Sequence, residues 1–133
     1  MKELTSIQRR DLLAKKDADP ATLRGYAEDY FAAESYDYAF EFYDRLQDRD
    51  GVTRIKCVAI KNGNGALLMR VADSRSGVVE RAEWLEAAEN ALRLGRRAYA
   101  AQAFFQAGQT DRVEELRAQL PQGAIPVIRE KGS

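Results

Sequence analysis

Carboxylate and guanidinium groups are the main side chains with which this chain of 133 residues could do chemistry. The sequence has 21 Asp and Glu, 21 Lys and Arg, one cysteine and no histidine. The absence of histidine excludes the Ser-His-Asp and Cys-His arrangements that activate nucleophiles. With a single cysteine it also excludes a tetrahedral zinc site and an internal disulfide, which agrees with a reducing, cytoplasmic location.

Paired carboxylates could in principle act as a general acid and base. Most of them lie at helical spacing from a basic residue, as Glu89 does from Arg93, which is typical of a solvated helix face. Asp44, Asp48 and Asp50 approach the spacing of a calcium loop, but arginines intervene and the closing glutamate is missing. We therefore expect no enzymatic activity, no cofactor and no metal ion.

Three further features have ordinary structural explanations. Segment 62–65 lacks the Gly-Lys-Ser/Thr of a phosphate-binding loop and is typical of a turn. Cys57 follows the apolar side of its segment, so we expect it to be a small buried side chain. Arg93, Arg96 and Arg97 form the densest basic cluster, at a helix junction where positive charge favours the C-terminal end of the first helix. Nucleic acid binding, which needs a longer basic stripe with exposed aromatic side chains, is therefore disfavoured.

The sequence predicts that these side chains are carried on α-helices. Ala, Leu, Glu and Arg dominate the sequence, and apolar residues recur at helical spacing. The net charge of zero and the 45% apolar content are typical of a folded domain without bulk affinity for nucleic acid or anionic lipid. No apolar run is long enough to cross a membrane or to form the core of a signal peptide.

Local capping signals mark the helix ends within a single all-α domain over residues 1–133. Pro20 suits the first position of a helix, Gly95 and Gly108 suit helix C-termini, and Asp111 with Glu114 resembles a capping box. The predicted parts are an N-terminal helix in 1–18, hairpins at 20–49, 52–76 and 79–108, a C-terminal helix at 111–120 and a tail at 121–133.

Two of these hairpins share a residue pattern at an offset of 61 residues. The first contains Leu23, Tyr26, Ala27, Tyr30, Tyr36, Ala39, Tyr43 and Leu46, and the second contains Trp84, Ala87, Ala88, Ala91, Arg97, Ala100, Phe104 and Ala107. A small residue on each helix of a pair lets the two helices approach closely, and larger side chains fill the remaining space.

Both patterns resemble the tetratricopeptide repeat, over about residues 20–110. The helix-breaking proline of the family is absent from both units, and the middle unit is shorter than the usual length of about 34 residues. The resemblance implies a right-handed α-solenoid of about three helical hairpins with flanking N- and C-terminal helices. An ordinary helical bundle would use nearly the same helices and remains the alternative.

The resemblance also implies a concave face, formed by the first helices of successive hairpins, that commonly holds a peptide or a partner helix. By helical phase, the side chains left free on these helices combine apolar residues with charges of both signs. They are Arg24, Glu28, Phe31, Lys56, Ile60, Leu85, Glu89, Leu92 and Arg93. Glu28 and Glu89 stand where chaperone-binding members have the Asn of a carboxylate clamp, which disfavours that function. The same side chains could instead pack against the flanking helices or against a second copy.

We therefore expect a non-catalytic protein–protein interaction module, such as an adaptor, scaffold or small chaperone, whose partner is another protein or a peptide. One alternative is a self-associating structural subunit whose groove is used by a symmetric contact. The other is a helical-repeat nucleic-acid binder that uses Arg93, Arg96 and Arg97 with Lys56 and Lys61.

Overall fold

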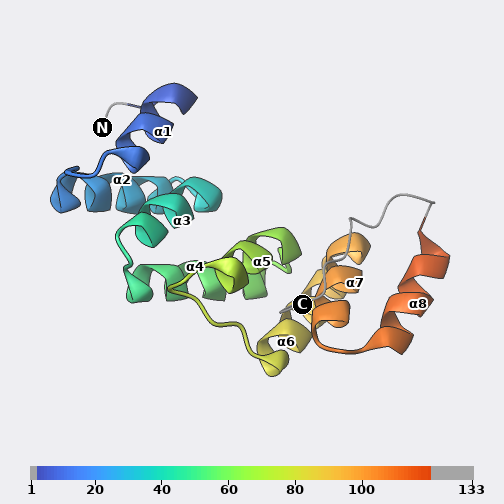
Figure 1. Cartoon of the computed structure of the whole chain (residues 1–133). Helices are drawn as coiled ribbons and strands as arrows, with labels where there is room; N and C mark the ends of the chain where they lie inside the picture. Colours follow the sequence, from blue (N-terminus) through green and yellow to red (C-terminus); the bar gives the residue numbers. More distant parts are fainter. Residues whose placement is uncertain (1–2, 121–133) are drawn as a thin grey trace. The chain divides into compact units, whose positions relative to one another are not determined.

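In a computed structural model, which describes residues 3–120, the chain forms eight α-helices and no strands (Figure 1). The helices are α1 (Ser6–Ala14), α2 (Pro20–Ala32), α3 (Tyr36–Arg45), α4 (Arg49–Lys61), α5 (Gly65–Asp73), α6 (Arg81–Arg93), α7 (Arg97–Gln106) and α8 (Thr110–Gln119). The predicted all-α class is thus confirmed. None of these helices is both long and apolar enough to cross a membrane. The predicted tail at 121–133 lies outside the described residues.

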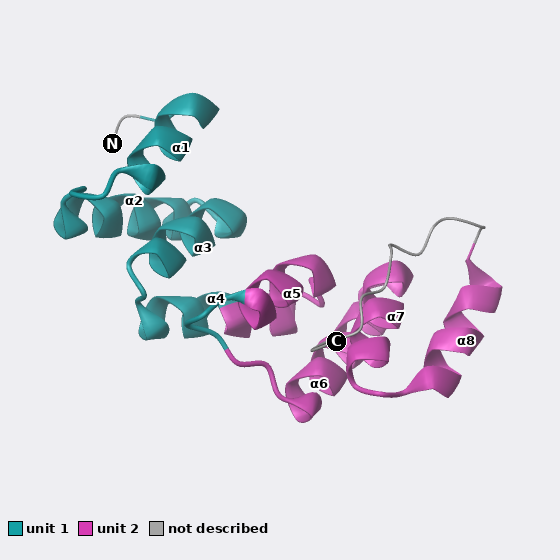
Figure 2. Ribbon diagram, viewed as in Figure 1, with its two compact units in different colours: residues 1–55, 74–77 teal, residues 56–73, 78–133 magenta. Residues whose placement is uncertain are grey.

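The described chain divides into two compact units, which have different colours in Figure 2. Unit 1 comprises the described residues up to Ile55 together with 74–77, and unit 2 comprises 56–73 together with the described residues from Val78 onward. Within unit 1, α2 packs along α3, and α1 contacts α3. Within unit 2, α6 packs along α7, α8 packs on α7, and α5 contacts both α6 and α7.

Five helix connections share one backbone geometry. After α6, the amide of Gly95 (φ 76°) donates to the Leu92 carbonyl at 3.0 Å, and the amide of Arg96 donates to the Ala91 carbonyl at 2.7 Å. These two bonds satisfy the last carbonyl groups of the helix. The same pair of bonds closes four other helices, where the residue with positive φ is Glu34, Gln47, Gly63 or Gly108.

In each of these turns, the residue that follows the positive φ directly precedes the next helix. Asp48 and Asn64 also cap that helix with their side chains, because they accept hydrogen bonds from the amides of Gly51 and Leu67, each at 3.1 Å. The connection therefore needs only three residues between successive helices. Connection 74–80, before α6, lacks this turn.

The predicted offset of 61 residues holds for the helix bounds. Helix α2 at 20–32 corresponds to α6 at 81–93, and α3 at 36–45 corresponds to α7 at 97–106. The turn residues with positive φ follow the same offset, since 34 and 47 correspond to 95 and 108. The small residues of the pattern are all 0% exposed, namely Ala27, Ala39, Ala88 and Ala100.

Three local predictions are wrong. The gap predicted between hairpins 20–49 and 52–76 is helical, because α4 begins at Arg49 and contains Gly51 in its first turn. Helix α8 begins at Thr110, so Asp111 lies inside it and does not form the predicted capping box. Cys57 is exposed, so it is not a core residue.

The two units have separate cores. In unit 1, Leu23, Phe42 and Tyr43 are almost completely buried, and in unit 2 Trp84 and Phe104 are. Burial of such large side chains is the main favourable contribution to folding.

Candidate interaction surface

The nine residues predicted to bind a partner are called the predicted surface below. Arg24, Glu28 and Phe31 belong to unit 1, on α2. The other six belong to unit 2, where Lys56 and Ile60 lie on α4 and the remaining four lie on α6. Each group is described within its own unit.

In unit 1, Glu28 forms the centre of a polar cluster. Its carboxylate accepts a hydrogen bond of 2.7 Å from the hydroxyl of Tyr43 and bonds of 3.1 and 3.2 Å from Nη1 of Arg54. The guanidinium carbon of Arg54 lies 4.1 Å from the centre of the Phe31 ring, a cation–π contact. The cluster therefore connects α2 to α3 and to α4.

The cluster changes the acidity of two of its members. The hydrogen bond from Tyr43, with support from Arg54, lowers the pKa of Glu28 below its ordinary value. Burial, together with the hydrogen bond to Glu28, raises the pKa of Tyr43 to about 12. At neutral pH, Glu28 is therefore a carboxylate and Tyr43 is a neutral donor.

Arg24 makes a second contact between α2 and the start of α4. Its Nη1 lies 2.5 Å from Oδ2 of Asp48, the residue that caps α4. Partial burial of Asp48 opposes ionisation, but the amide of Gly51 and the charge of Arg24 together lower its pKa. Arg24 thus binds a carboxylate that is held in its charged form.

In unit 2, Lys56 connects α4 to the start of α6. Its ammonium group lies 2.9 Å from Oε2 of Glu83 and donates to the carbonyl of Val78 at 3.1 Å. Glu83 also accepts a hydrogen bond from the amide of Glu80 at 2.9 Å. Burial opposes ionisation of Glu83, but these partners lower its pKa. The Lys56 side chain is only 19% exposed, so its role is first of all structural.

Ile60 belongs to the core, since it is only 7% exposed. Its carbonyl accepts a hydrogen bond of 2.9 Å from the side chain of Asn90, which ties the end of α4 to α6. We therefore leave Ile60 out of the surface that a partner could reach. Leu85 and Leu92 are half-buried on α6.

The most accessible part of the predicted surface lies at the end of α6. The Glu89 side chain is 60% exposed and lies 3.6 Å from Nη1 of Arg112 on α8. Arg93 is exposed, and among residues 3–120 its only bonding partner is Asn90, three residues earlier, at 3.1 Å. Arg112 in turn places its guanidinium carbon 4.5 Å from the centre of the Phe104 ring.

The structure thus brings Arg24, Glu28, Lys56 and Glu89 to partners outside their own helices. These partners, namely Tyr43, Asp48, Arg54, Glu83 and Arg112, were not among the predicted surface residues. Their side-chain types were visible in the sequence, but their pairing depends on helix packing. The offset of 61 residues gave one usable signal, because Glu28 and Glu89 are equivalent positions and both bind an arginine.

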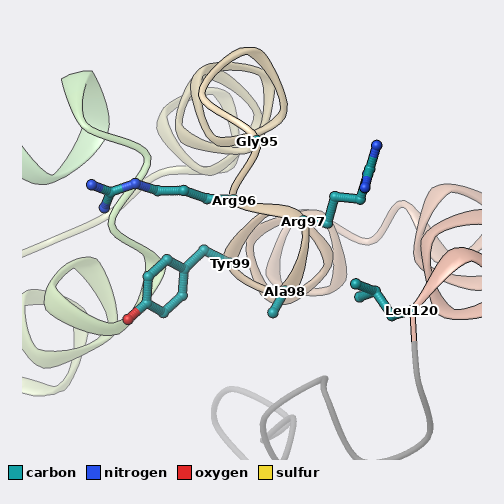
Figure 3. A pocket seen from close by; sticks show the side chains of 6 residues that line it. All are labelled: Gly95, Arg96, Arg97, Ala98, Tyr99 and Leu120. Atoms are coloured by element: carbon teal, nitrogen blue, oxygen red, sulfur yellow. The ribbon is translucent and has the colours of Figure 1, made fainter.

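No group of three or more His, Cys, Asp or Glu residues in the described part of the chain could hold a metal ion. A pocket of about 400 Å³ lies between α1 and α3, where Arg9 and Glu41 form an ion pair of 3.6 Å. A pocket of about 350 Å³ lies at the start of α7, lined by Gly95, Arg96, Arg97, Ala98, Tyr99 and Leu120 (Figure 3). Neither pocket includes a residue of the predicted surface.

No protein-family model matches this chain, and no curated protein or solved structure matches it. Function therefore has to be inferred from the residues and contacts of the chain itself.

Proposed function

We propose that this protein is a non-catalytic, cytoplasmic interaction module with tetratricopeptide-like architecture. In this architecture α2–α3, α4–α5 and α6–α7 are the hairpins of a right-handed solenoid, and α1 and α8 flank them. The equal lengths of α2, α4 and α6, at 13 residues each, support it. The same turn geometry after each of these helices supports it as well. A regular two-helix repeat is the basis of such solenoids.

The observation that carries the proposal is a set of contacts between helices. Within each unit, residues of the predicted surface bind residues on or next to the first helix of another predicted hairpin. Within unit 1, Arg24 of α2 binds Asp48, which directly precedes α4, and Glu28 of α2 binds Arg54 in α4. Within unit 2, Lys56 of α4 binds Glu83 of α6. Within each unit, these side chains therefore link neighbouring helices at the predicted surface.

A partner for this surface needs both apolar and charged groups. Phe31, Leu85 and Leu92 are half-buried, whereas Glu89 and Arg93 are exposed. Because interhelical ion pairs already hold the helices, a partner would bind without ordering them, which lowers the entropic cost of binding. An amphipathic helix or an extended peptide fits these features.

Site-specific photo-cross-linking in the native cell tests the proposal. We would place a photoreactive amino acid at position 89, and as a matched control at position 115. The Glu89 and Glu115 side chains are 60% and 67% exposed, and both contact Arg112. We expect position 89 to cross-link a discrete protein that position 115 does not capture.

A charge reversal then checks the same surface without the photoreactive group. Arg93 and Arg117 both lie in the last turn of a helix of unit 2, so reversal has a similar electrostatic cost at either site. R93E should release the cross-linked protein, and R117E should retain it. Equal capture from positions 89 and 115, or equal retention by R93E and R117E, would contradict the proposed surface.

A further inference from the structure

Two equivalent helix turns carry opposite charge. The turn between α2 and α3 has Asp29, Glu34 and Asp37 and is called the acidic turn; the turn between α6 and α7 has Arg93, Arg96 and Arg97 and is called the basic turn. At the offset of 61 residues, the acidic residues correspond to Asn90, Gly95 and Ala98, and the arginines correspond to Ala32, Ser35 and Tyr36. The two turns thus share a backbone but not a charge.

Four of these charges have no partner within the described chain. Asp29, Glu34, Arg96 and Arg97 are all exposed, and no described residue forms a hydrogen bond or an ion pair with their side chains. By contrast Glu28, the neighbour of Asp29, binds both Tyr43 and Arg54. The free charges are therefore available to another molecule.

Local stability does not explain these charges. Asp29 lies in the last turn of α2, where the helix dipole disfavours a negative charge. Arg97 is the first residue of α7, where the dipole disfavours a positive charge. Glu34 has a φ of 61°, which costs a residue with a side chain more than glycine, and its equivalent is Gly95. Residues that cost local stability without an internal contact are expected at functional positions.

Each turn also exposes an apolar side chain. Leu94, between Arg93 and Arg96, is 47% exposed, and Tyr38, next to Asp37, is 40% exposed. Figure 3 shows Arg96 and Arg97 extending to opposite sides of the basic turn, beside the pocket of about 350 Å³. An exposed apolar group flanked by charges is the composition of a protein interface.

We propose that the basic turn of one copy binds the acidic turn of a second copy of this chain. The two surfaces are complementary in charge, and every copy carries one of each. The net charge of zero means that no long-range repulsion opposes association. The contact joins unlike surfaces, so it is heterologous, and it weakens as salt screens the charges.

Sedimentation velocity over a range of protein concentrations tests this proposal. At low salt we expect the wild-type chain to associate, and at high salt to be monomeric. Two reversals, R96E/R97E and D29K/E34K, should each weaken self-association about tenfold or more, because each creates a chain with two turns of like charge. An equimolar mixture of the two variants should associate again, because their turns are then complementary.

Controls separate this contact from loss of folding and from net charge. The reversals at Asp29 and Arg97 place each new charge at the favourable helix end, so thermal melting should be unchanged or improved. K61E/R117E alters two exposed cations elsewhere in unit 2 and changes the net charge as R96E/R97E does, so it should associate like the wild type.

Three results would overturn the proposal. They are a wild-type chain that is monomeric at low salt, reversal variants that associate like the wild type, and a mixture of the two variants that stays monomeric. A monomeric chain that binds single-stranded RNA through Arg96 and Arg97 would overturn it in favour of nucleic acid binding.

Discussion

The hydroxyl of Tyr43 donates a 2.7 Å hydrogen bond to the carboxylate of Glu28, and this bond joins α3 to α2 within unit 1. Tyr43 is 0% exposed, and burial with the bond to Glu28 raises its pKa from 10 to about 12. The folded chain therefore keeps the phenolic proton to a higher pH than the unfolded chain does. The resulting stabilisation is complete below pH 10 and is lost as the pH rises from 10 to about 12.

Replacement of Tyr43 by Phe should remove that pH dependence. Phe104 occupies the equivalent position in unit 2, so a phenyl ring fits this kind of site. We expect Y43F to lower the free energy of unfolding by about 1 kcal/mol at neutral pH, the contribution of one hydrogen bond. Urea unfolding at a series of pH values should show a shallower alkaline decline for Y43F. Parallel curves for the two proteins would mean that Tyr43 ionises alike in both states.

Gln47 and Gly108 occupy equivalent turns, with φ of 53° and 79°. A left-handed residue with a side chain is strained, whereas glycine is not. We expect Q47G to raise the melting temperature, because relief of strain exceeds the extra chain entropy that glycine has when unfolded. G108A should lower the stability by about 1 kcal/mol although its surroundings are open. A lower melting temperature for Q47G would show that Gln47 makes a contact that outweighs the strain.

Two features require a glycine at position 63, namely its positive φ of 60° and the close approach of Ala91. A β-carbon there would lie 2.4 Å from the Cα of Ala91 on α6, whereas one at Gly95 would have nothing within 4 Å. Because φ is positive at both sites, the difference between G63A and G95A isolates the close approach. We expect G63A to cost about 1–3 kcal/mol more in chemical denaturation. Equal losses of stability in G63A and G95A would mean that the turn at Gly63 lies further from α6.

Ala88 tests the predicted close crossing of α6 and α7. It is 0% exposed, and its replacement by Leu should overpack the contact and cost about 1–3 kcal/mol. Ala82 lies on the same helix but is exposed, so A82L should leave the melting temperature nearly unchanged. A variant A88L as stable as A82L would exclude the proposed helix register.

The helices could be predicted because their signals are local. Pro20, Gly95 and Gly108 mark helix ends through the backbone conformations that they allow, and the structure places them there. The role of Gly51 is not local: a β-carbon there would lie 2.1 Å from Cδ1 of Tyr43, so the glycine permits close approach inside a helix. Such an approach depends on how α3 and α4 pack, which no short segment of sequence encodes.

The orientation of α4 was predictable in principle. Val52, Ile55 and Ala59 are buried and follow helical spacing, which places Cys57 on the other side of the helix. The exposure of Cys57 could therefore have been predicted by applying the helical period to these buried positions. The partners of the predicted surface were not predictable, since Glu28 and Arg54 are 26 residues apart and meet only after α2 and α4 have packed.

The five shared turns also bear on how the molecule opens. In each turn one residue serves two helices: the amide of Arg96 bonds back to Ala91 at 2.7 Å, and its carbonyl accepts from Ala100 at 2.9 Å. Fraying of one helix end therefore breaks the first bond of the next helix, which couples neighbouring helices in local unfolding. Amide hydrogen exchange should then show the helices that share such a turn opening together, for example α2 with α3 in unit 1 and α6, α7 and α8 in unit 2.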